Sequence, residues 1–523
     1  MTHQVVVAPM LVALGTAVLC LLTREARRLQ VAVSLTGSVV YAVAVAALVL
    51  TVVPGGVVAY HLGDWAAPFG IILVADSLSA FMLAFTALLA VASLVFSVRY
   101  VDAYGQRLSY HPLFHFMLVG VTGAFLTGDI FNLFVWFEVM LMSSYVLVVF
   151  YSGPEHTRAA LQYVVLNLIG SAVMLLAIGG IYAVTGTLNM ADLAHRLGDP
   201  GTYGLTVAPI LGLSGILFAV FALKAGIVPF QFWVPAAYEA APAPVTAMLA
   251  GVVKKVGIYA VIRLYFTVFA AAPLPELALP GFAGTSALSY FGPILFVMAG
   301  ASILFGGVSA VSRDSMEGLL AYSSIGQVGF IALPLAVGAT VATPAVRQLA
   351  VLAALVYVLN HALAKGMLFL AAGTVRDGVG SSQFADLGGL AGRTPVLAGA
   401  FFVGALSLVG VPPLTGFFGK FLVFDALSRA GSTLGLAVAL VGAILTIAYF
   451  TRAWNQSFWG PVTPGVEEAT LDPVKVGVVV VLAVAIVAVG VGFDPVYRFA
   501  DAAARAALAR QAYVHAVLGG GAA

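Results

Sequence analysis

Five of the six lysines in this sequence lie inside long apolar segments, where lysine is rare. They are Lys224, Lys254, Lys255, Lys365 and Lys420, and only Lys475 lies near the edge of such a segment. An ionised lysine at the middle of a membrane costs about 2.5–3.5 kcal/mol on insertion scales. Burial disfavours its charged form and a nearby carboxylate favours it. A lysine between these two influences can change its protonation when the partner moves, which is the chemistry that a proton path requires.

Glu138 is the best carboxylate partner for these lysines, because it lies near the middle of the apolar segment 132–145. An ionisable residue within a membrane is by default a functional candidate. The structural alternative is a glutamate that hydrogen-bonds to serine or asparagine of a neighbouring helix. Asp76 and Asp129 lie near segment ends, where a helix-capping or interfacial role is equally open.

His361 and Lys365 are four residues apart and therefore share one helix face. Histidine titrates near neutral pH, which suits a proton relay, although a lone buried histidine is more often structural. Lys254 and Lys255 are adjacent, so we expect one to line the path and the other to extend toward the membrane surface. Further polar side chains could bridge the path through water: His115, Tyr322, Ser323, Ser324 and Gln327.

The composition explains why these few charges stand out. Of 523 residues, 62% are hydrophobic and 8% are charged, whereas soluble proteins carry about 25% charged residues. The chain is therefore an all-α polytopic membrane protein. Its net charge of +2 is too small to suggest a nucleic-acid partner. One cysteine, Cys20, excludes a disulfide framework, and no phosphate-binding loop, haem-ligand pair or zinc pattern is present, so we expect no cofactor and no metal.

Hydropathy predicts fourteen spans, which must be helices because lipid cannot satisfy an open strand edge. Their limits are 4–22, 30–53, 71–98, 112–128, 130–151, 160–185, 206–238, 245–271, 289–311, 316–338, 345–372, 396–430, 434–456 and 473–493. The connector 188–197 has helical spacing and is expected at the membrane surface. Odd-numbered connections carry eleven lysines and arginines and even-numbered ones three. This bias predicts cytoplasmic odd connections and both termini outside; the arginines of the C-terminal tail run against it.

Spans seven and twelve are expected to be broken. Segments 221–235 and 406–421 each place glycine and proline at mid-span, followed by aromatic residues. A proline inside a helix removes a hydrogen bond and clashes with the preceding turn. Two breaks five spans apart suggest two inverted five-span repeats with a transport site near the midplane; simple proline kinks are the alternative. The predicted organisation is 1–111 (spans 1–3), 112–271 (first repeat), 289–456 (second repeat) and 473–523 (span 14 and tail).

The sequence resembles a known family, the antiporter-like subunits shared by Mrp-type Na⁺/H⁺ antiporters and respiratory NADH–quinone oxidoreductase. The resemblance covers roughly residues 70–460. It is carried by the segments 128–138, 224–230, 255–259, 320–329, 361–365 and 413–420. Segment 131–145 is most similar to the D-type subunit of Mrp antiporters.

The resemblance implies fourteen spans, two inverted repeats and a midplane chain of polar residues. By motif position, this chain consists of Glu138, Lys224, Lys255, His361, Lys365 and Lys420, with Lys255 rather than Lys254 at the span-eight position. It also implies A-, B-, C-, E-, F- and G-type Mrp partner subunits, protons and Na⁺ as transported ions, and a multi-pass location in the bacterial cytoplasmic membrane.

We therefore expect a non-enzymatic D-type subunit in which Glu138 and Lys224 pair across spans five and seven. Protons would pass from Lys224 to Lys255, then to His361 and Lys365, and then to Lys420. The first alternative is a proton-pumping subunit of NADH–quinone oxidoreductase or a related redox complex. The second is a stand-alone transporter or channel.

Overall fold

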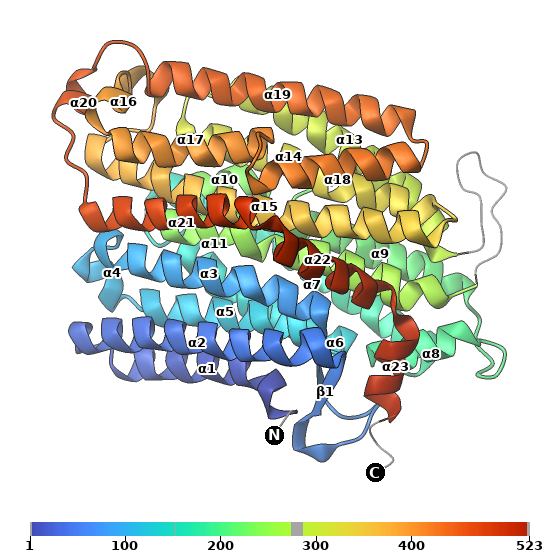
Figure 1. Ribbon diagram of the computed structural model, residues 1–523. Coiled ribbons are helices and arrows are strands. Elements are labelled where there is room, and N and C mark those ends of the chain that lie inside the picture. The colour runs from blue at the N-terminus through green and yellow to red at the C-terminus, as the bar shows by residue number, and fades with distance from the viewer. Residues whose placement is uncertain (1–2, 152, 274–285, 520–523) are drawn as a thin grey trace.

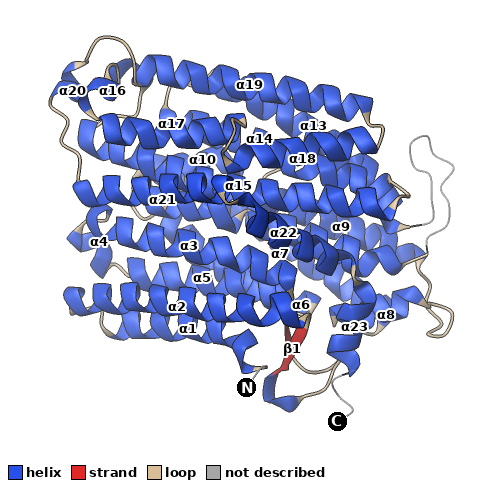
Figure 2. Ribbon diagram, viewed as in Figure 1, coloured by secondary structure: helices blue, strands red, loops and turns tan. Residues whose placement is uncertain are grey.

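Apolar segments fold as helices here because a helix satisfies its backbone hydrogen bonds internally. The computed structural model describes residues 3–151, 153–273 and 286–519. Its helices form one bundle of roughly parallel elements (Figure 1, Figure 2). Within the described part, twelve helices are long and apolar enough to cross a membrane, and two shorter apolar ones, α5 and α17, accompany them.

Each predicted span coincides with a helix or a broken helix. The first seven segments contain α1 (Gln4–Leu22), α2 (Arg27–Gly55), α3 (Ser77–Tyr100), α5 (Tyr110–Leu126), α6 (Ile130–Val148), α7 (Pro154–Thr185), and α9 (Ala208–Ala225) with α10 (Trp233–Ala240). The other seven contain α11 (Ala243–Met248) with α12 (Lys255–Val261), α13 (Ala287–Val311), α14 (Met316–Thr340), α15 (Pro344–Val379), α17 (Pro395–Val409) with α18 (Thr415–Arg429), α19 (Thr433–Ser457) and α21 (Pro473–Val491).

Short helices lie at the two ends of the bundle (Figure 1). One end carries α4 (Ala103–Arg107), α16 (Leu390–Arg393) and α20 (Pro464–Glu467); we call it the α4 end. The opposite end, here the β1 end, carries strand β1 (Val58–His61), α8 (Met190–Gly198) and α23 (Arg510–Leu518). Short 3₁₀ turns cover Leu62–Asp64, Phe269–Ala271 and Phe384–Asp386. The predicted helical connector is confirmed as α8, whose apolar side chains pack against α23.

The start of predicted span three was wrong. Residues 72–75 form strand β2 (Ile72–Ala75), which pairs antiparallel with β1 in the register Val58 opposite Ala75. Hydropathy cannot distinguish a short apolar strand from the first turn of a helix. The helix itself begins at Ser77, because the Asp76 carboxylate accepts the Ser79 backbone N–H at 2.9 Å and caps it.

Both predicted breaks are confirmed. Helix α9 ends at Ala225 and α17 ends at Val409, and each is followed by a glycine with positive φ, +67° at Gly226 and +96° at Gly410. Left-handed backbone of this kind is costly for residues other than glycine. Each break frees carbonyl groups near the middle of the bundle, where they need donors.

Span eight is the most irregular membrane segment. Two π-helical stretches, Leu249–Val253 and Ile262–Val268, flank α12. The segment 243–271 is buried on all sides, and α14 and α15 are almost as fully buried. These three elements therefore form the interior of the bundle, and they carry Lys255, His361 and Lys365 of the predicted site.

The C-terminal tail forms two helices. Helix α22 (Phe493–Leu508) crosses the bundle obliquely from the end of α21, and α23 follows it at the β1 end (Figure 1). Small side chains of α22, such as Ala500 and Ala504, are buried where it packs on α3 and α15. Its charged side is neutralised by the i,i+4 ion pairs Arg498–Asp494 and Arg505–Asp501.

Candidate functional site

The site residues predicted from sequence lie in the interior of the bundle. Lys255, His361 and Lys365 are fully buried, and Lys224 and Lys420 are 2% and 5% exposed. Glu138 on α6 is half-buried, with its Oε1 atom inaccessible to solvent. Lysine side chains are almost never fully buried unless paired. Each buried lysine therefore needs neighbouring groups that stabilise it.

Lys255 and His361 form the closest contact of the site. Lys255 Nζ lies 2.6 Å from His361 Nδ1 and donates to the Ala250 carbonyl at 2.5 Å. The Ala250 carbonyl belongs to the π-helical stretch Leu249–Val253. A nitrogen–nitrogen hydrogen bond needs one donor and one acceptor. The two groups therefore cannot both be protonated on the facing atoms, and they share one proton between them.

The histidine extends this contact to a second lysine through Ser324. His361 Nε2 lies 3.2 Å from Ser324 Oγ, and Lys254 Nζ donates to the same oxygen at 3.2 Å and to the Ser324 carbonyl at 3.3 Å. Both ring nitrogens of His361 are thus used, one on each side. We call the connected set Lys254–Ser324–His361–Lys255 the central chain. A neutral imidazole at its middle can accept a proton on one nitrogen and release one from the other.

The expectation that one of the adjacent lysines reaches the membrane surface was wrong. Lys254 and Lys255 are both fully buried and both belong to the central chain. The physical reason is the π-helix Leu249–Val253, in which Lys254 N–H bonds to the Leu249 carbonyl five residues earlier. The wider turn changes the direction of the following side chains, so the rotation of about 100° per residue of a regular α-helix does not apply to this segment.

Lys365 contacts Ser323, which precedes Ser324 of the central chain in the sequence. Its Nζ donates to the Leu320 carbonyl at 2.9 Å and to Ser323 Oγ. One turn further along α14, Gln327 bonds Tyr449 OH at 2.7 Å and Thr446 Oγ1 at 3.2 Å, and it accepts from Tyr357 OH. Ser323 and Ser324 thus contact buried lysines directly, whereas Gln327 bonds Thr446, Tyr449 and Tyr357. Bridging of the path through water stays a prediction.

Lys420 lies against the second break. Its Nζ donates to the Val409 carbonyl at 3.0 Å, the last residue of α17, and lies 5.0 Å from the centroid of the Phe330 ring. The C-terminus of a helix carries partial negative charge and favours a cation. A Cβ at Gly410 would lie 3.0 Å from Lys420 Cδ, so the glycine provides the space that the lysine stem occupies.

Lys224 lies against the first break, in the last turn of α9. Its Nζ is 5.8 Å from the centroids of both the Tyr163 and the Trp233 rings, and it has no hydrogen-bond partner among the described residues. In the same turn the Leu223 carbonyl accepts from Trp233 Nε1 at 2.7 Å and from the Gly226 backbone N–H at 3.0 Å, so it is not left for the lysine.

The predicted direct pair of Glu138 with Lys224 is not formed. In the described part of the chain neither Glu138 Oε1 nor Lys224 Nζ has a polar partner. The reason is that the ammonium group is directed at two aromatic faces, which attract a cation through the ring quadrupole. Glu138 remains within electrostatic range of Lys224, so the two groups interact without contact.

Two further sequence candidates lie outside the network. His115 bonds Ser34 Oγ at 2.9 Å and joins α5 to α2, and Tyr322 stacks under the Arg313 guanidinium at 4.5 Å. Asp129 caps α6 by accepting the Asn132 backbone N–H at 2.7 Å. The capping alternative for Asp76 and Asp129 is therefore confirmed for both.

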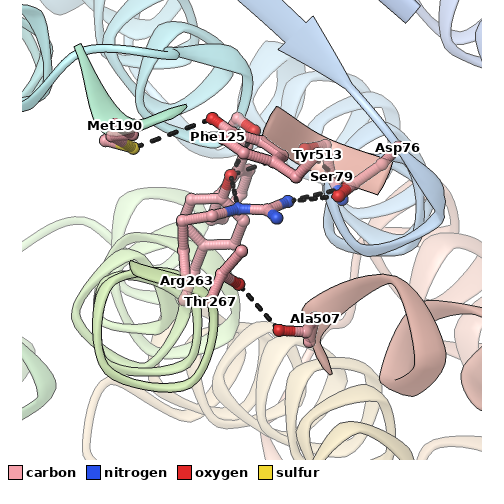
Figure 3. Close-up of polar contacts among 9 residues, drawn as sticks. Asp76, Ser79, Phe125, Met190, Arg263, Thr267, Ala507 and Tyr513 are labelled. Atoms are coloured by element: carbon pink, nitrogen blue, oxygen red, sulfur yellow. Dashed lines mark hydrogen bonds and ion pairs between the residues drawn. The ribbon is translucent and has the colours of Figure 1, made fainter. Parts of the chain in front are cut away.

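A buried ion pair, Asp76 with Arg263, was missed by the sequence analysis (Figure 3). Arg263 Nη2 donates to the two Asp76 oxygens at 2.8 and 2.6 Å, and both side chains are 1% exposed. Arg263 Nε lies 3.3 Å from Tyr259 OH, and the Tyr513 ring of α23 covers the guanidinium at 4.9 Å. An arginine inside predicted span eight was the available signal. The pair ties α3, span eight and the C-terminal helix together.

The pairing of charges differs between the lysine network and the Asp76–Arg263 pair. Within the residues that the structure describes, none of the five lysines at mid-span forms an ion pair. Arg263 and Lys475, which are also buried, each contact an aspartate, Asp76 and Asp377. Arg263 is thus compensated and permanently charged. The lysines are solvated by carbonyls, hydroxyls and aromatic faces, which suits groups that exchange protons.

Comparison with known proteins shows the family to which this chain belongs. Residues 127–446 match the model of the family described as NADH:quinone oxidoreductase/Mrp antiporter, transmembrane. The chain belongs to this family. All the lysines of the central chain, and Glu138, Lys224, His361, Lys365 and Lys420, lie inside the matched region.

Relatives in the family point to the D-type antiporter subunits. The chain is 35% identical over 473 residues to the D-type subunit of the Na⁺/H⁺ antiporter of Alkalihalophilus pseudofirmus, covering 90% of each protein. It is 37% identical over 417 residues to the N-type subunit of the NADH-quinone oxidoreductase of Desulforudis audaxviator, covering 79% of this chain and 77% of the relative. A chain in the solved structure of the Mrp complex from a Dietzia species superposes with a TM-score of 0.88, at 28% identity and 99% coverage of both chains. The resemblance to the D-type Mrp proteins, the membrane-arm fold and the multi-pass membrane character are thereby confirmed.

Proposed function

We propose that this chain is the proton-translocating D-type subunit of a multisubunit Na⁺/H⁺ antiporter. The observation that carries the proposal is the central chain, in which two buried lysines are joined through Ser324 and His361 with contacts of 2.6–3.2 Å. The D-type antiporter relatives support the same function for the whole chain. Its partners would be the other Mrp-type subunits, in the cytoplasmic membrane of a bacterium. By the arginine bias, the α4 end would face the cytoplasm, and both termini the outside.

In this mechanism Lys224 is controlled by Glu138 at a distance. A negative Glu138 favours a protonated Lys224, and neutralising or displacing that carboxylate releases the proton. The side chain of Lys254 lies next to the first break, because its Nζ is 3.7 Å from the Cβ position of Gly226. The proton would therefore pass from Lys224 to Lys254 before it reaches Lys255, which refines the order expected from sequence.

The later steps use the second half of the molecule. His361 passes the proton between Ser324 and Lys255. Lys365 is connected to this chain through its hydrogen bond to Ser323. From there the proton would pass the hydrogen-bonded group Gln327, Tyr357 and Tyr449 to Lys420 at the second break. Hydroxyl groups suit such transfers because they donate and accept at once. Each proton that moves inward along the membrane potential provides about 2.3 kcal/mol per 100 mV, which would drive cation export.

The test is ΔpH-linked Na⁺ exchange in the assembled complex carrying Glu138→Ala or Lys224→Ala. The proposal predicts that both variants lose most of the exchange rate while the complex still assembles. Full exchange in both variants would refute the mechanism.

A redox-driven proton pump is the second candidate, and the NADH-quinone oxidoreductase relative favours it. Its proton path would use the same residues, and the redox centres would lie in other chains. Purification of the native complex separates the two functions. Flavin or iron–sulfur absorbance in the purified complex would identify the redox enzyme, and co-purification of the other Mrp-type subunits without such absorbance would identify the antiporter.

A further inference from the structure

A cavity at the α4 end leads from the surface toward the central chain. Its outer part has a volume of about 390 Å³ and is lined by Tyr100, Tyr151, His156, Arg376 and Asp377. We call this part the vestibule. Beneath it lies a narrow space of about 10 Å³, which shares Tyr100, Ala241 and Arg376 with the vestibule. This inner volume is close to the minimum that one water molecule requires.

Two glutamates line this narrow space, one exposed and one buried. Glu239 is exposed at the end of α10, and Glu317 in the first turn of α14 is only 9% exposed. They lie close together, because Glu239 Oε1 is 3.3 Å from the Cβ position of Gly318. Glu317 Oε2 is buried without a hydrogen-bond partner among the described residues. A buried carboxylate oxygen without a donor is costly, and a proton on it removes that cost.

Tyr238 lies between these glutamates and the central chain. It lines the same narrow space, is 1% exposed, and its hydroxyl makes no hydrogen bond of normal geometry with the described residues. Its ring lies 5.8 Å from Lys254 Nζ. Lys255, by contrast, is turned toward His361 and Ala250. Lys254 is thus the one of the two adjacent lysines whose ammonium group faces a ring that lines this cavity.

We propose that protons pass between the vestibule and the central chain through Glu239 and Glu317, by way of Tyr238, to Lys254. This proposal rests on the function proposed above and assigns different roles to the two lysines. Lys254 exchanges protons with the α4 end of the molecule, and Lys255 exchanges them with His361. The groups become steadily more buried along the route, from the exposed Glu239 to the fully buried Lys254. For inward flow, a proton leaves Lys254 Nζ and binds the Glu317 carboxylate, with the Tyr238 hydroxyl or one water accepting and releasing a proton between them.

The test compares exchange rates of assembled complexes carrying Glu317→Gln, Glu239→Gln and both changes. Glutamine keeps the size of the side chain and removes the exchangeable proton. We expect the double variant to exchange at least about tenfold more slowly than the unmodified complex. Glu317→Asp, which keeps a carboxylate, should retain a clearly larger rate than Glu317→Gln. Glu468→Gln is the matched control, because Glu468 is exposed near the same end in the loop after α20 and lines neither part of the cavity.

Lys365→Ala, measured in parallel, separates failure of the route from failure of the proposed function. A slow Lys365→Ala complex with full exchange in Glu239→Gln/Glu317→Gln would overturn the access route and leave the proton path standing. Full exchange in both would overturn the proposed function as well. Equal rates for Glu317→Asp and Glu317→Gln would also contradict the proposal, because they would show that the carboxylate acts only through packing.

Discussion

Lys255 Nζ and His361 Nδ1 lie 2.6 Å apart in the interior of the bundle, although 106 residues separate them in the sequence. The contact joins span eight to α15 and lets one proton belong to either side chain. Its neighbours are hydroxyls and carbonyls rather than carboxylates. The protonation of this pair is therefore free to change with the groups around it, which is the property that a transport path needs and a structural ion pair lacks.

Replacing His361 should interrupt the central chain. His361→Ala removes both ring nitrogens, so Lys255 and Ser324 lose their shared partner, and we expect a drop of at least about tenfold in ΔpH-linked Na⁺ exchange, at the lower end of what acid–base groups contribute. His195→Ala on α8 is the control, because that side chain is exposed and lies outside the network. Equal rates in both variants would show that His361 is structural.

Lys224→Arg separates charge from proton release. Arginine keeps the positive charge near Tyr163 and Trp233 but does not deprotonate in proteins. We expect assembled complexes with near-normal yield and little exchange. If Lys224→Arg exchanges as fast as the unmodified complex, the role of Lys224 is that of a fixed charge.

Gly410→Ala should disturb Lys420 directly. The backbone at Gly410 has φ +96°, and a Cβ there would lie 3.0 Å from Lys420 Cδ. An alanine in left-handed backbone costs roughly 1–2 kcal/mol, and the contact should displace the lysine from the Val409 carbonyl. We expect reduced exchange, measured against Gly399→Ala in α17, where an added Cβ meets no atom within 4 Å. Similar losses in both variants would exclude this local effect.

Breaking the Asp76–Arg263 pair should lower the stability of the complex more than it lowers the exchange rate. Asp76→Asn leaves a buried guanidinium uncompensated, and losses of about 3–5 kcal/mol are typical of such changes. Thermal unfolding of the purified complex should therefore occur at a lower temperature. The double variant Asp76→Asn/Arg263→Met should recover part of the loss, because no unpaired charge remains. An unchanged unfolding temperature for Asp76→Asn would contradict the assigned role.

The sequence alone located the lysines, because lipid excludes most charges from membrane spans. It also located the two breaks, because glycine and proline together at mid-span interrupt a helix. Gly226 and Gly410 end helices where the pattern of glycine, proline and aromatic residues predicts. The sequence could not show that Lys254 and Lys255 enter one network, since the π-helix before them changes the side-chain directions. Hydropathy does not distinguish a π-helical turn from an α-helical one.

Contacts between residues far apart in the chain could not be predicted from the sequence either. Asp76 and Arg263 are 187 residues apart, and each has a local explanation, as a helix cap or as one polar residue in an apolar span. The strand Ile72–Ala75 is as apolar as the helix that follows it. Whether Glu138 touches Lys224 depends on how the rings of Tyr163 and Trp233 lie between α7 and α10, which only the packed structure specifies.

The most direct test of the central claim is proton-coupled Na⁺ exchange by the complex carrying Lys365→Ala. The complex would be purified, reconstituted into liposomes with a pH-sensitive dye inside, and checked for all subunits. The account predicts that exchange falls to near the level of empty liposomes, because Lys365 joins the central chain to the side that leads to Lys420. Exchange at the rate of the unmodified complex would contradict it.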